Sequence, residues 1–109
     1  MATSEDFMQF VLDQLNALEG ISHRKMFGEY GVYYQGKIFG LVCDNQLFIK
    51  PTESGRAFIG SVQEAPPYPG AKNSFLITEQ LENSAWLQEL VKITAAELPE
   101  PKPKTKKKR

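Results

Sequence analysis

The chain has 109 residues, of which 41% are hydrophobic and 24% are charged, and its formal net charge at pH 7 is zero. These values fit one globular domain with a single hydrophobic core. The single cysteine, Cys43, excludes an internal disulfide framework. No apolar run approaches the ~20 residues needed to span a bilayer, and the acidic N-terminus lacks the features of a signal peptide. We therefore expect a cytoplasmic protein that makes no membrane contact.

The zero net charge hides an uneven distribution. Six basic residues and no acidic residues lie between Lys102 and Arg109. The rest of the chain then has seven basic and thirteen acidic residues, a formal charge of −6. The sequence thus combines an acidic body with a cationic tail, so the net charge of the whole chain does not describe the charge of the body.

The first predicted element is a helix from about Ser4 to Glu19, because apolar residues recur there at three- and four-residue spacing. Thr3 or Ser4 can cap its N-terminus, and Gly20 can end it. Its apolar positions are Phe7, Met8, Val11, Leu12, Leu15 and Leu18.

The next stretch, Arg24 to Lys50, predicts a tight antiparallel meander. A first strand near residues 22–27 bends at Gly28 and is followed by three more runs rich in β-branched and aromatic residues. Gln35-Gly36 and Asp44-Asn45 separate these runs and are typical of two-residue hairpin turns. The three runs are Glu29–Tyr34, Lys37–Cys43 and Gln46–Lys50.

The remaining elements are short. Pro51 ends the meander, and Thr52 can cap a short helix that runs to Ile59. The Pro-rich stretch from Gly60 to Gly70 is predicted to be a loop. A strand over residues 73–78 and a helix that Asn83 or Ser84 can cap and that runs to Leu98 complete the domain.

This order of elements predicts an α+β fold. We expect a two-layer sandwich, in which helices at the N- and C-termini pack on one face of an antiparallel sheet of four or five strands. Residues 1–98 would form the domain. Residues 99–109 alternate proline with lysine and have no large apolar side chain to bury, so we expect a disordered tail.

The run Arg24-Lys25-Met26-Phe27-Gly28-Glu29-Tyr30-Gly31-Val32-Tyr33 resembles the N-terminal domain family of the TfoX/Sxy competence regulators. The family pattern is a basic residue, Met-Phe-Gly, one variable position, then Tyr-Gly with an aromatic residue shortly after. The resemblance continues through residues 36–39 and 44–50 and reaches Tyr68, so it covers roughly residues 7–98.

The resemblance implies an α+β domain in a bacterial, non-enzymatic regulatory context. Full-length members of this family act with a cyclic-AMP receptor protein to switch on DNA-uptake genes, and they carry a second, helical domain. In this chain a Lys/Pro tail follows Leu98. We therefore expect a stand-alone N-terminal domain.

Residues able to carry chemistry are few. Metal sites need three or four clustered ligands, so the lone His23 is interpreted as a strand-edge residue and no cofactor is expected. Cys43 ends an apolar strand and is interpreted as a small buried hydrophobe rather than a nucleophile. Glu29, Glu79 and Glu82 are interpreted as solvated surface residues. These patterns favour a protein without enzymatic activity.

The aromatic residues of the meander have two interpretations. They could stack nucleic-acid bases on the sheet, or they could pack in the core and across strands. Packing is favoured, because the body of the chain is acidic. Both faces of the meander are apolar, and helices can cover only one, so we expect the other to be covered by the Pro-rich loop or by a partner subunit. The aromatic residues are Phe27, Tyr30, Tyr33, Tyr34, Phe39 and Phe48.

Candidate contact residues fall into two groups. The first would bind a protein partner or an anion, although its cations could equally pair with the surplus carboxylates. The second is the basic tail, which could contact nucleic-acid phosphates or serve only as a solubilising segment. The first group is Arg24, Lys25, Tyr30, Lys50, Arg56 and Tyr68. The second is Lys102, Lys104, Lys106, Lys107, Lys108 and Arg109.

The leading hypothesis is a regulatory domain that binds a protein partner, such as a transcription regulator or a second copy of the chain. The alternative is a weak, sequence-independent nucleic-acid-binding module that uses the basic tail. An enzyme with an unrecognised site is a third class, which a defined pocket with perturbed carboxylates would favour.

Overall fold

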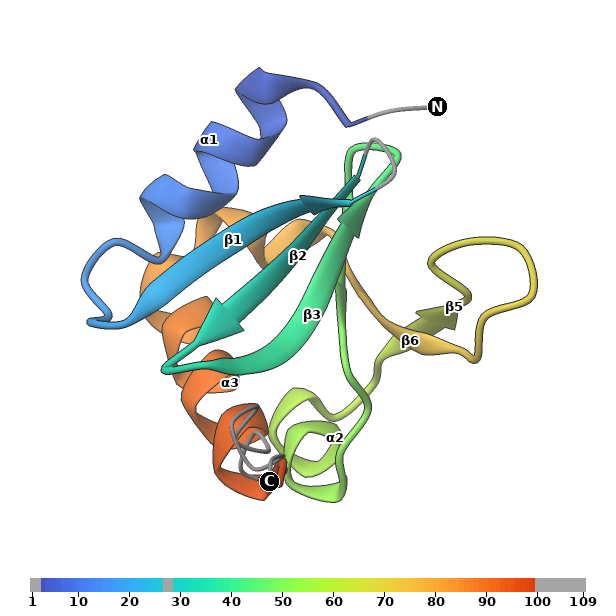
Figure 1. Ribbon diagram of the computed structural model, residues 1–109. Coiled ribbons are helices and arrows are strands. Elements are labelled where there is room, and N and C mark those ends of the chain that lie inside the picture. Colours follow the sequence, from blue (N-terminus) through green and yellow to red (C-terminus); the bar gives the residue numbers. More distant parts are fainter. Residues whose placement is uncertain (1–2, 27–28, 100–109) are drawn as a thin grey trace, which may run out of the picture.

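The computed structural model describes residues 3–26 and 29–99. These residues form an α+β fold, in which helices lie on one face of a six-stranded antiparallel sheet (Figure 1). The helices are α1 (Glu5–Gln14), α2 (Glu53–Ile59), the 3-10 helix η1 (Glu79–Glu82) and α3 (Ser84–Glu97). The strands are β1 (Ile21–Met26), β2 (Glu29–Tyr34), β3 (Lys37–Cys43), β4 (Gln46–Ile49), β5 (Gln63–Ala65) and β6 (Ser74–Ile77).

The predicted fold class and meander are confirmed. The strands lie in the order β1-β2-β3-β4-β6-β5, so the first four form an uninterrupted meander. Gln35 and Gly36 have φ values of 51° and 85°, and Asp44 and Asn45 have values of 53° and 58°. Positive φ at both central residues defines the type I′ turn, whose twist matches that of the paired strands. The bend expected at Gly28 lies outside the described residues.

The sheet has more strands than predicted, because β5 lies inside the stretch that was expected to be a loop. Gln63, Glu64 and Ala65 pair with Leu76, Phe75 and Ser74 of β6. Only this pairing defines the strand, since three residues are too short to show a periodic pattern. The prediction of a continuous loop over residues 60–70 was therefore wrong.

Helix α1 is also shorter than predicted. It ends at Gln14, where the hydrogen bonds change to the tighter three-residue spacing, as in Leu15 N–H to Leu12 C=O and Leu18 N–H to Leu15 C=O. This turn still directs Leu15 into the core, where it is fully buried, and Leu18 packs against the same core. The apolar spacing therefore continued past the end of the helix.

One side chain caps the N-terminus of each of the three α-helices that the structure describes. The Ser4 hydroxyl accepts the N–H of Phe7 at 3.1 Å, and the Asn83 side chain accepts the N–H of Trp86 at 3.1 Å. Thr52 caps α2, as expected, by accepting the N–H of Gly55 at 2.9 Å. Each such cap satisfies a backbone donor that has no partner inside the helix.

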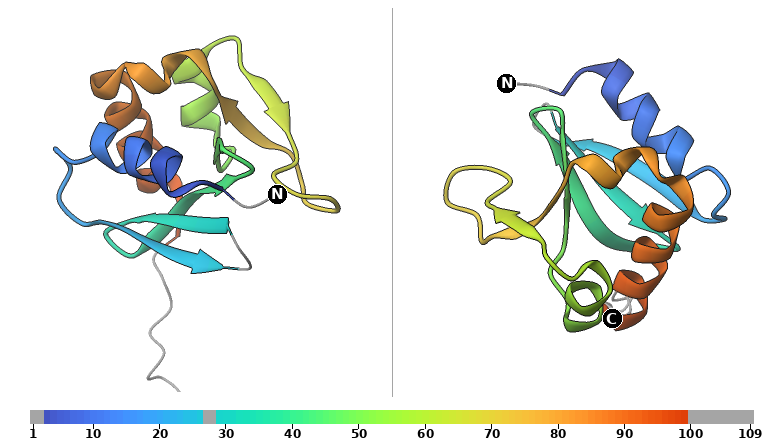
Figure 2. Two further views of the ribbon diagram at one scale, coloured as in Figure 1. Left: turned by 90° about the horizontal axis from the view of Figure 1, so that it is seen from above. Right: turned by 180° about the vertical axis from the view of Figure 1, so that it is seen from behind.

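The main core lies between the helices and the sheet (Figure 2). It joins residues from α1, α3 and strands β2, β3, β4 and β6, so the two ends of the domain fold onto one sheet. Among the described residues, no helix is long and apolar enough to cross a membrane. The core residues are Met8, Val11, Leu15, Tyr30, Val32, Phe39, Val42, Leu47, Ile49, Phe75, Ile77, Leu87, Leu90 and Val91.

Candidate protein-binding surface

The face of the sheet away from the helices carries a second, smaller apolar cluster, which we call the open face. Cys43, Phe48 and Leu76 are its buried members, and Leu41 and Ala65 pack against them while remaining partly exposed. Leu41 pairs with Phe48, and Phe48 pairs with Leu76, so the cluster forms a row across three neighbouring strands. The sheet is therefore apolar on both faces, as the sequence pattern indicated.

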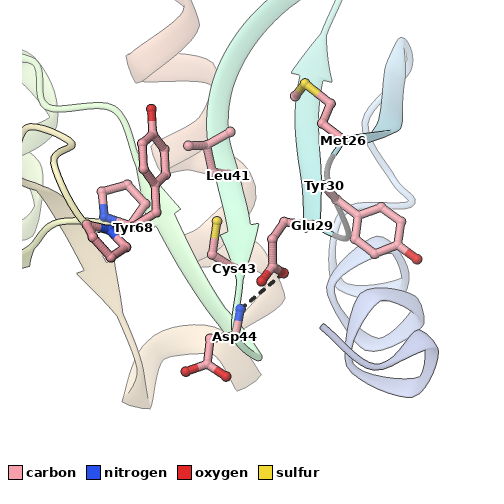
Figure 3. Close-up of a pocket in the computed structure, with 9 residues that line it drawn as sticks. Met26, Glu29, Tyr30, Leu41, Cys43, Asp44 and Tyr68 are labelled. Atoms are coloured by element: carbon pink, nitrogen blue, oxygen red, sulfur yellow. Dashed lines mark hydrogen bonds between the residues drawn. The ribbon is translucent and has the colours of Figure 1, made fainter. Parts of the chain in front are cut away.

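A groove of about 640 Å³ lies on the open face, between the meander and the Pro-rich loop (Figure 3). Tyr68 rises on one side of it and Met26 and Glu29 on the other, with Leu41 and Cys43 between them. Tyr68 is 55% exposed. The lining residues are Met26, Glu29, Tyr30, Leu41, Cys43, Asp44, Pro67, Tyr68 and Pro69. The Pro-rich loop thus covers part of the open face, and the groove remains for a ligand or partner.

Glu29 has a structural role at one end of this groove. Its Oε1 accepts the Thr3 hydroxyl at 2.5 Å, the Thr3 N–H at 3.1 Å and the Asp44 N–H at 3.2 Å. The Asn45 side chain accepts the Ser4 N–H at 2.9 Å, which adds a second link between the N-terminus and the β3–β4 turn. Glu29 therefore anchors the start of α1 to the sheet, and its interpretation as a solvated surface residue was wrong.

Cys43 lies in the groove but is poorly suited to act as a nucleophile. Its side chain is buried, and burial is the main cause that raises the pKa of its thiol to about 11, with further contributions from the charges of Glu29 and Asp44. The thiolate is the reactive form of cysteine, and at neutral pH almost none is present. This agrees with its interpretation as a small buried hydrophobe.

The candidate cations do not converge on one site. Arg24 and Lys25 lie on β1, the edge strand at one side of the sheet, where both are exposed. Arg56 of α2 pairs with Glu64 of β5 at 2.8 Å, near the opposite edge. The Arg56 guanidinium also lies 5.1 Å from the centre of the Phe75 ring. Arg56 is therefore engaged within the domain.

Lys50 lies apart from both groups. It follows β4, and two strands separate it from Arg24 on β1. Three inter-strand spacings amount to about 14 Å, so the folding of the meander does not bring Arg24 and Lys50 together.

The aromatic residues mostly serve packing. Phe39 and Phe48 are buried, and Tyr34 packs against the main core. Tyr30 is only 9% exposed, and its ring points away from Tyr68, toward the side where it lies 5.8 Å from the His23 ring (Figure 3). Phe27 lies outside the described residues. The packing interpretation is therefore supported for these four rings, whereas Tyr33 is partly exposed and belongs to neither apolar cluster.

His23 is exposed on the edge strand β1, as predicted. Within residues 3–26 and 29–99, no group of three His, Cys, Asp or Glu side chains is arranged to hold a metal ion. The tail cations, Lys102 to Arg109, lie outside the described residues.

The surface missed by sequence reasoning is the groove itself. Its walls come from segments far apart in the chain, since Met26 and Leu41 belong to the meander and Pro67 and Pro69 to the loop after β5. The Pro-rich loop was expected to cover the open face, but no local pattern places its residues opposite Met26.

The fold and this surface define the class of protein: a small α+β domain with one sheet face covered by helices and one partly open. The chain belongs to the TfoX N-terminal domain family, whose pattern matches residues 13–98. It is also similar to an uncharacterized 12.7 kDa protein encoded in the trpE 5′ region of Spirochaeta aurantia. The two are 39% identical over 107 residues, which cover 98% of this chain and 93% of the relative.

Proposed function

We propose that this domain is a non-enzymatic regulator that acts in the cytoplasm by binding a protein partner on its open face. Its membership of the TfoX N-terminal domain family supports a role in regulating competence genes. The observation that carries the proposal is the groove beside Leu41 and Tyr68, where apolar side chains remain accessible on a face that the described helices leave uncovered.

The partner that fits the family context is a transcription regulator of DNA-uptake genes. Such a partner would bury an apolar segment in the groove, with Tyr68 at its rim as a contact residue. Aromatic residues in this position are favoured as anchors of protein interfaces, because they bury a large area with few rotatable bonds. A second copy of this chain is the competing occupant of the same face.

The test is a gene deletion in the native organism, followed by measurement of DNA-uptake transcripts. We expect the transcripts to fall and to be restored by the wild-type chain but not by Tyr68→Ala. Phe10→Ala is the matched control, because Phe10 is the other exposed large aromatic among the described residues and lies on α1, at the helical face.

If Tyr68→Ala fully restored the transcripts, the partner would bind outside the groove. If the deletion left the transcripts unchanged, the regulatory role would be contradicted. Sedimentation of the purified protein separates the two occupants. A concentration-dependent dimer that Tyr68→Ala dissociates would assign the groove to a second copy.

The basic tail supports a second candidate, a weak nucleic-acid contact. Six cations on a short segment beside an acidic body form a concentrated site for phosphates. On this proposal the tail supplies the phosphate contacts, and residues 1–98 supply the position of the tail on the nucleic acid.

A further inference from the structure

The sheet ends in two edge strands of different character. At one side β5 has only three residues, and its Glu64 pairs with Arg56. At the other side β1 has six residues, and the four central ones are exposed. A strand of this length with a free side is a template for pairing with another chain.

The free backbone groups of β1 follow from the hydrogen-bond pattern. The Gln35 N–H donates to the Gly20 C=O at 2.8 Å, just before β1 begins. Antiparallel bonding alternates along a strand, so every second residue after Gly20 bonds to β2. The residues between them, Ile21, His23 and Lys25, therefore direct their N–H and C=O groups away from the sheet.

No hydrogen bond from another described element reaches these outward groups. They recur at every second residue, which is the spacing that an added strand requires. Ile21, His23 and Lys25 thus offer three donors and three acceptors to an extended peptide.

The charge of this edge identifies the kind of strand that fits. Residues 1–101 carry a formal charge of −6, yet His23, Arg24 and Lys25 are consecutive on β1. The two ion pairs found among the described residues, Arg56–Glu64 and Lys92–Glu89, do not involve them. Because side chains alternate along a strand, Arg24 projects to the open face and Lys25 to the opposite face. A strand beside β1 would therefore meet positive charge on both faces.

We propose that β1 binds an extended acidic segment of a protein partner, which adds to the sheet as a seventh strand. This inference rests on the proposed function, because it gives the same partner a second contact along β1, next to the groove that Met26 at the end of β1 lines. A second copy of β1 does not fit this place, because symmetric pairing would bring the basic side chains of two copies together.

The probe is a fluorescein-labelled peptide, Thr-Glu-Val-Glu-Val-Glu-Thr, and its binding is measured by fluorescence anisotropy at low ionic strength. The matched peptide has lysine in place of each glutamate. We expect the glutamate peptide to bind and the lysine peptide not to bind. Arg24→Glu combined with Lys25→Glu should lower the affinity for the glutamate peptide at least about tenfold. Lys72→Glu, an exposed charge reversal between β5 and β6, should leave its affinity within about twofold.

Strand addition is separated from simple charge attraction by two backbone tests. His23→Pro removes one outward N–H but no bond to β2, whereas His23→Ala keeps that N–H. We expect His23→Pro to bind at least about fivefold more weakly than His23→Ala. The second test uses two peptides, each methylated at one of the two alternating sets of backbone nitrogens, and an unchanged protein. Methylation of the nitrogens that face β1 should abolish binding, whereas methylation of those that face away should not.

Equal binding by His23→Pro and His23→Ala, together with equal binding of both methylated peptides, would overturn the proposal. So would failure of the glutamate peptide to bind. Introducing His23→Pro into the transcript assay separates the edge-strand proposal from the regulatory role. Lost regulation supports the edge, while intact regulation overturns the edge and leaves the regulatory role standing.

Discussion

Two glycines of the sheet, Gly40 and Gly31, differ in what an added methyl group would meet. At Gly40 a Cβ atom would lie 2.3 Å from the Phe48 carbonyl oxygen, which belongs to the backbone of the neighbouring strand. At Gly31 it would lie 2.5 Å from the terminal methyl group of Met26, which can rotate away. The close approach of the two strands at Gly40 therefore requires glycine. At Gly31 a larger residue needs only a movement of the Met26 side chain.

We expect Gly40→Ala to lower the free energy of unfolding by about 2–3 kcal/mol, because β3 and β4 must separate to admit the methyl group. Gly31→Ala should cost about 1 kcal/mol or less. Urea unfolding followed by circular dichroism measures both. Equal losses for the two variants would show that the approach of β3 to β4 is not the constraint.

The buried thiol of Cys43 should react slowly in the folded protein. Because burial raises the pKa of its thiol to about 11, iodoacetamide should alkylate Cys43 in the folded protein far more slowly than a free cysteine at about pH 8. Unfolding in urea should restore the ordinary rate. Rapid labelling of the folded protein, followed by mass spectrometry, would instead indicate an accessible thiolate and revive the enzymatic interpretation.

Secondary-structure elements that depend on residues close together in the sequence were predicted better than elements that depend on distant contacts. The turns at Gln35-Gly36 and Asp44-Asn45 were predicted correctly, because asparagine and glycine tolerate the positive φ that such turns need. Strand β5 could not be predicted, since only its pairing with β6 defines it. The end of α1 was also predicted incorrectly, because the apolar spacing continues past Gln14 into a turn that is not α-helical.

Helix α2 provides a pH-dependent element. The exposed carboxylate of Glu97, the last residue of α3, accepts the N–H groups of Ser54 at 2.9 Å and Glu53 at 3.1 Å. The Ser54 N–H is the main cause that lowers the pKa of Glu97. A lowered folded-state pKa means that this contact stabilises the fold above the ordinary glutamate pKa and is lost as pH falls through the folded value.

We therefore expect Glu97→Gln to be less stable than wild type at neutral pH, and the difference to shrink as the pH falls below the ordinary glutamate pKa and through the lowered pKa of Glu97. Urea unfolding at several pH values measures the difference, and Glu89→Gln, on the exposed side of α3, is the control. A gap between wild type and Glu97→Gln that widens on acidification would contradict the assignment.

The whole molecule separates charge between an acidic body and a cationic tail. If the tail contacts phosphates, deletion of residues 101–109 should abolish a gel shift with DNA or RNA at low salt, because it removes all six tail cations. The shift of the full chain should also fall steeply as salt rises. An unchanged shift after the deletion would reject the nucleic-acid role of the tail.

The candidate surface was less predictable than the fold. The sequence indicated a second apolar face and singled out Tyr68, Arg24 and Lys25, but it could not show that Tyr68 stands across a groove from Met26. It also could not show that Arg56 is engaged by Glu64 and that Glu29 holds the N-terminus. Each of these depends on contacts between distant segments, which residue patterns do not encode.

We propose that this domain acts through contact of its open face with a partner protein. The most direct test is photo-crosslinking in the native cell, with a photoreactive phenylalanine analogue placed at Tyr68 or, as control, at Phe10. We expect an adduct with one defined protein from position 68 and none from position 10. An adduct from position 10 alone, or no adduct from position 68, would contradict it.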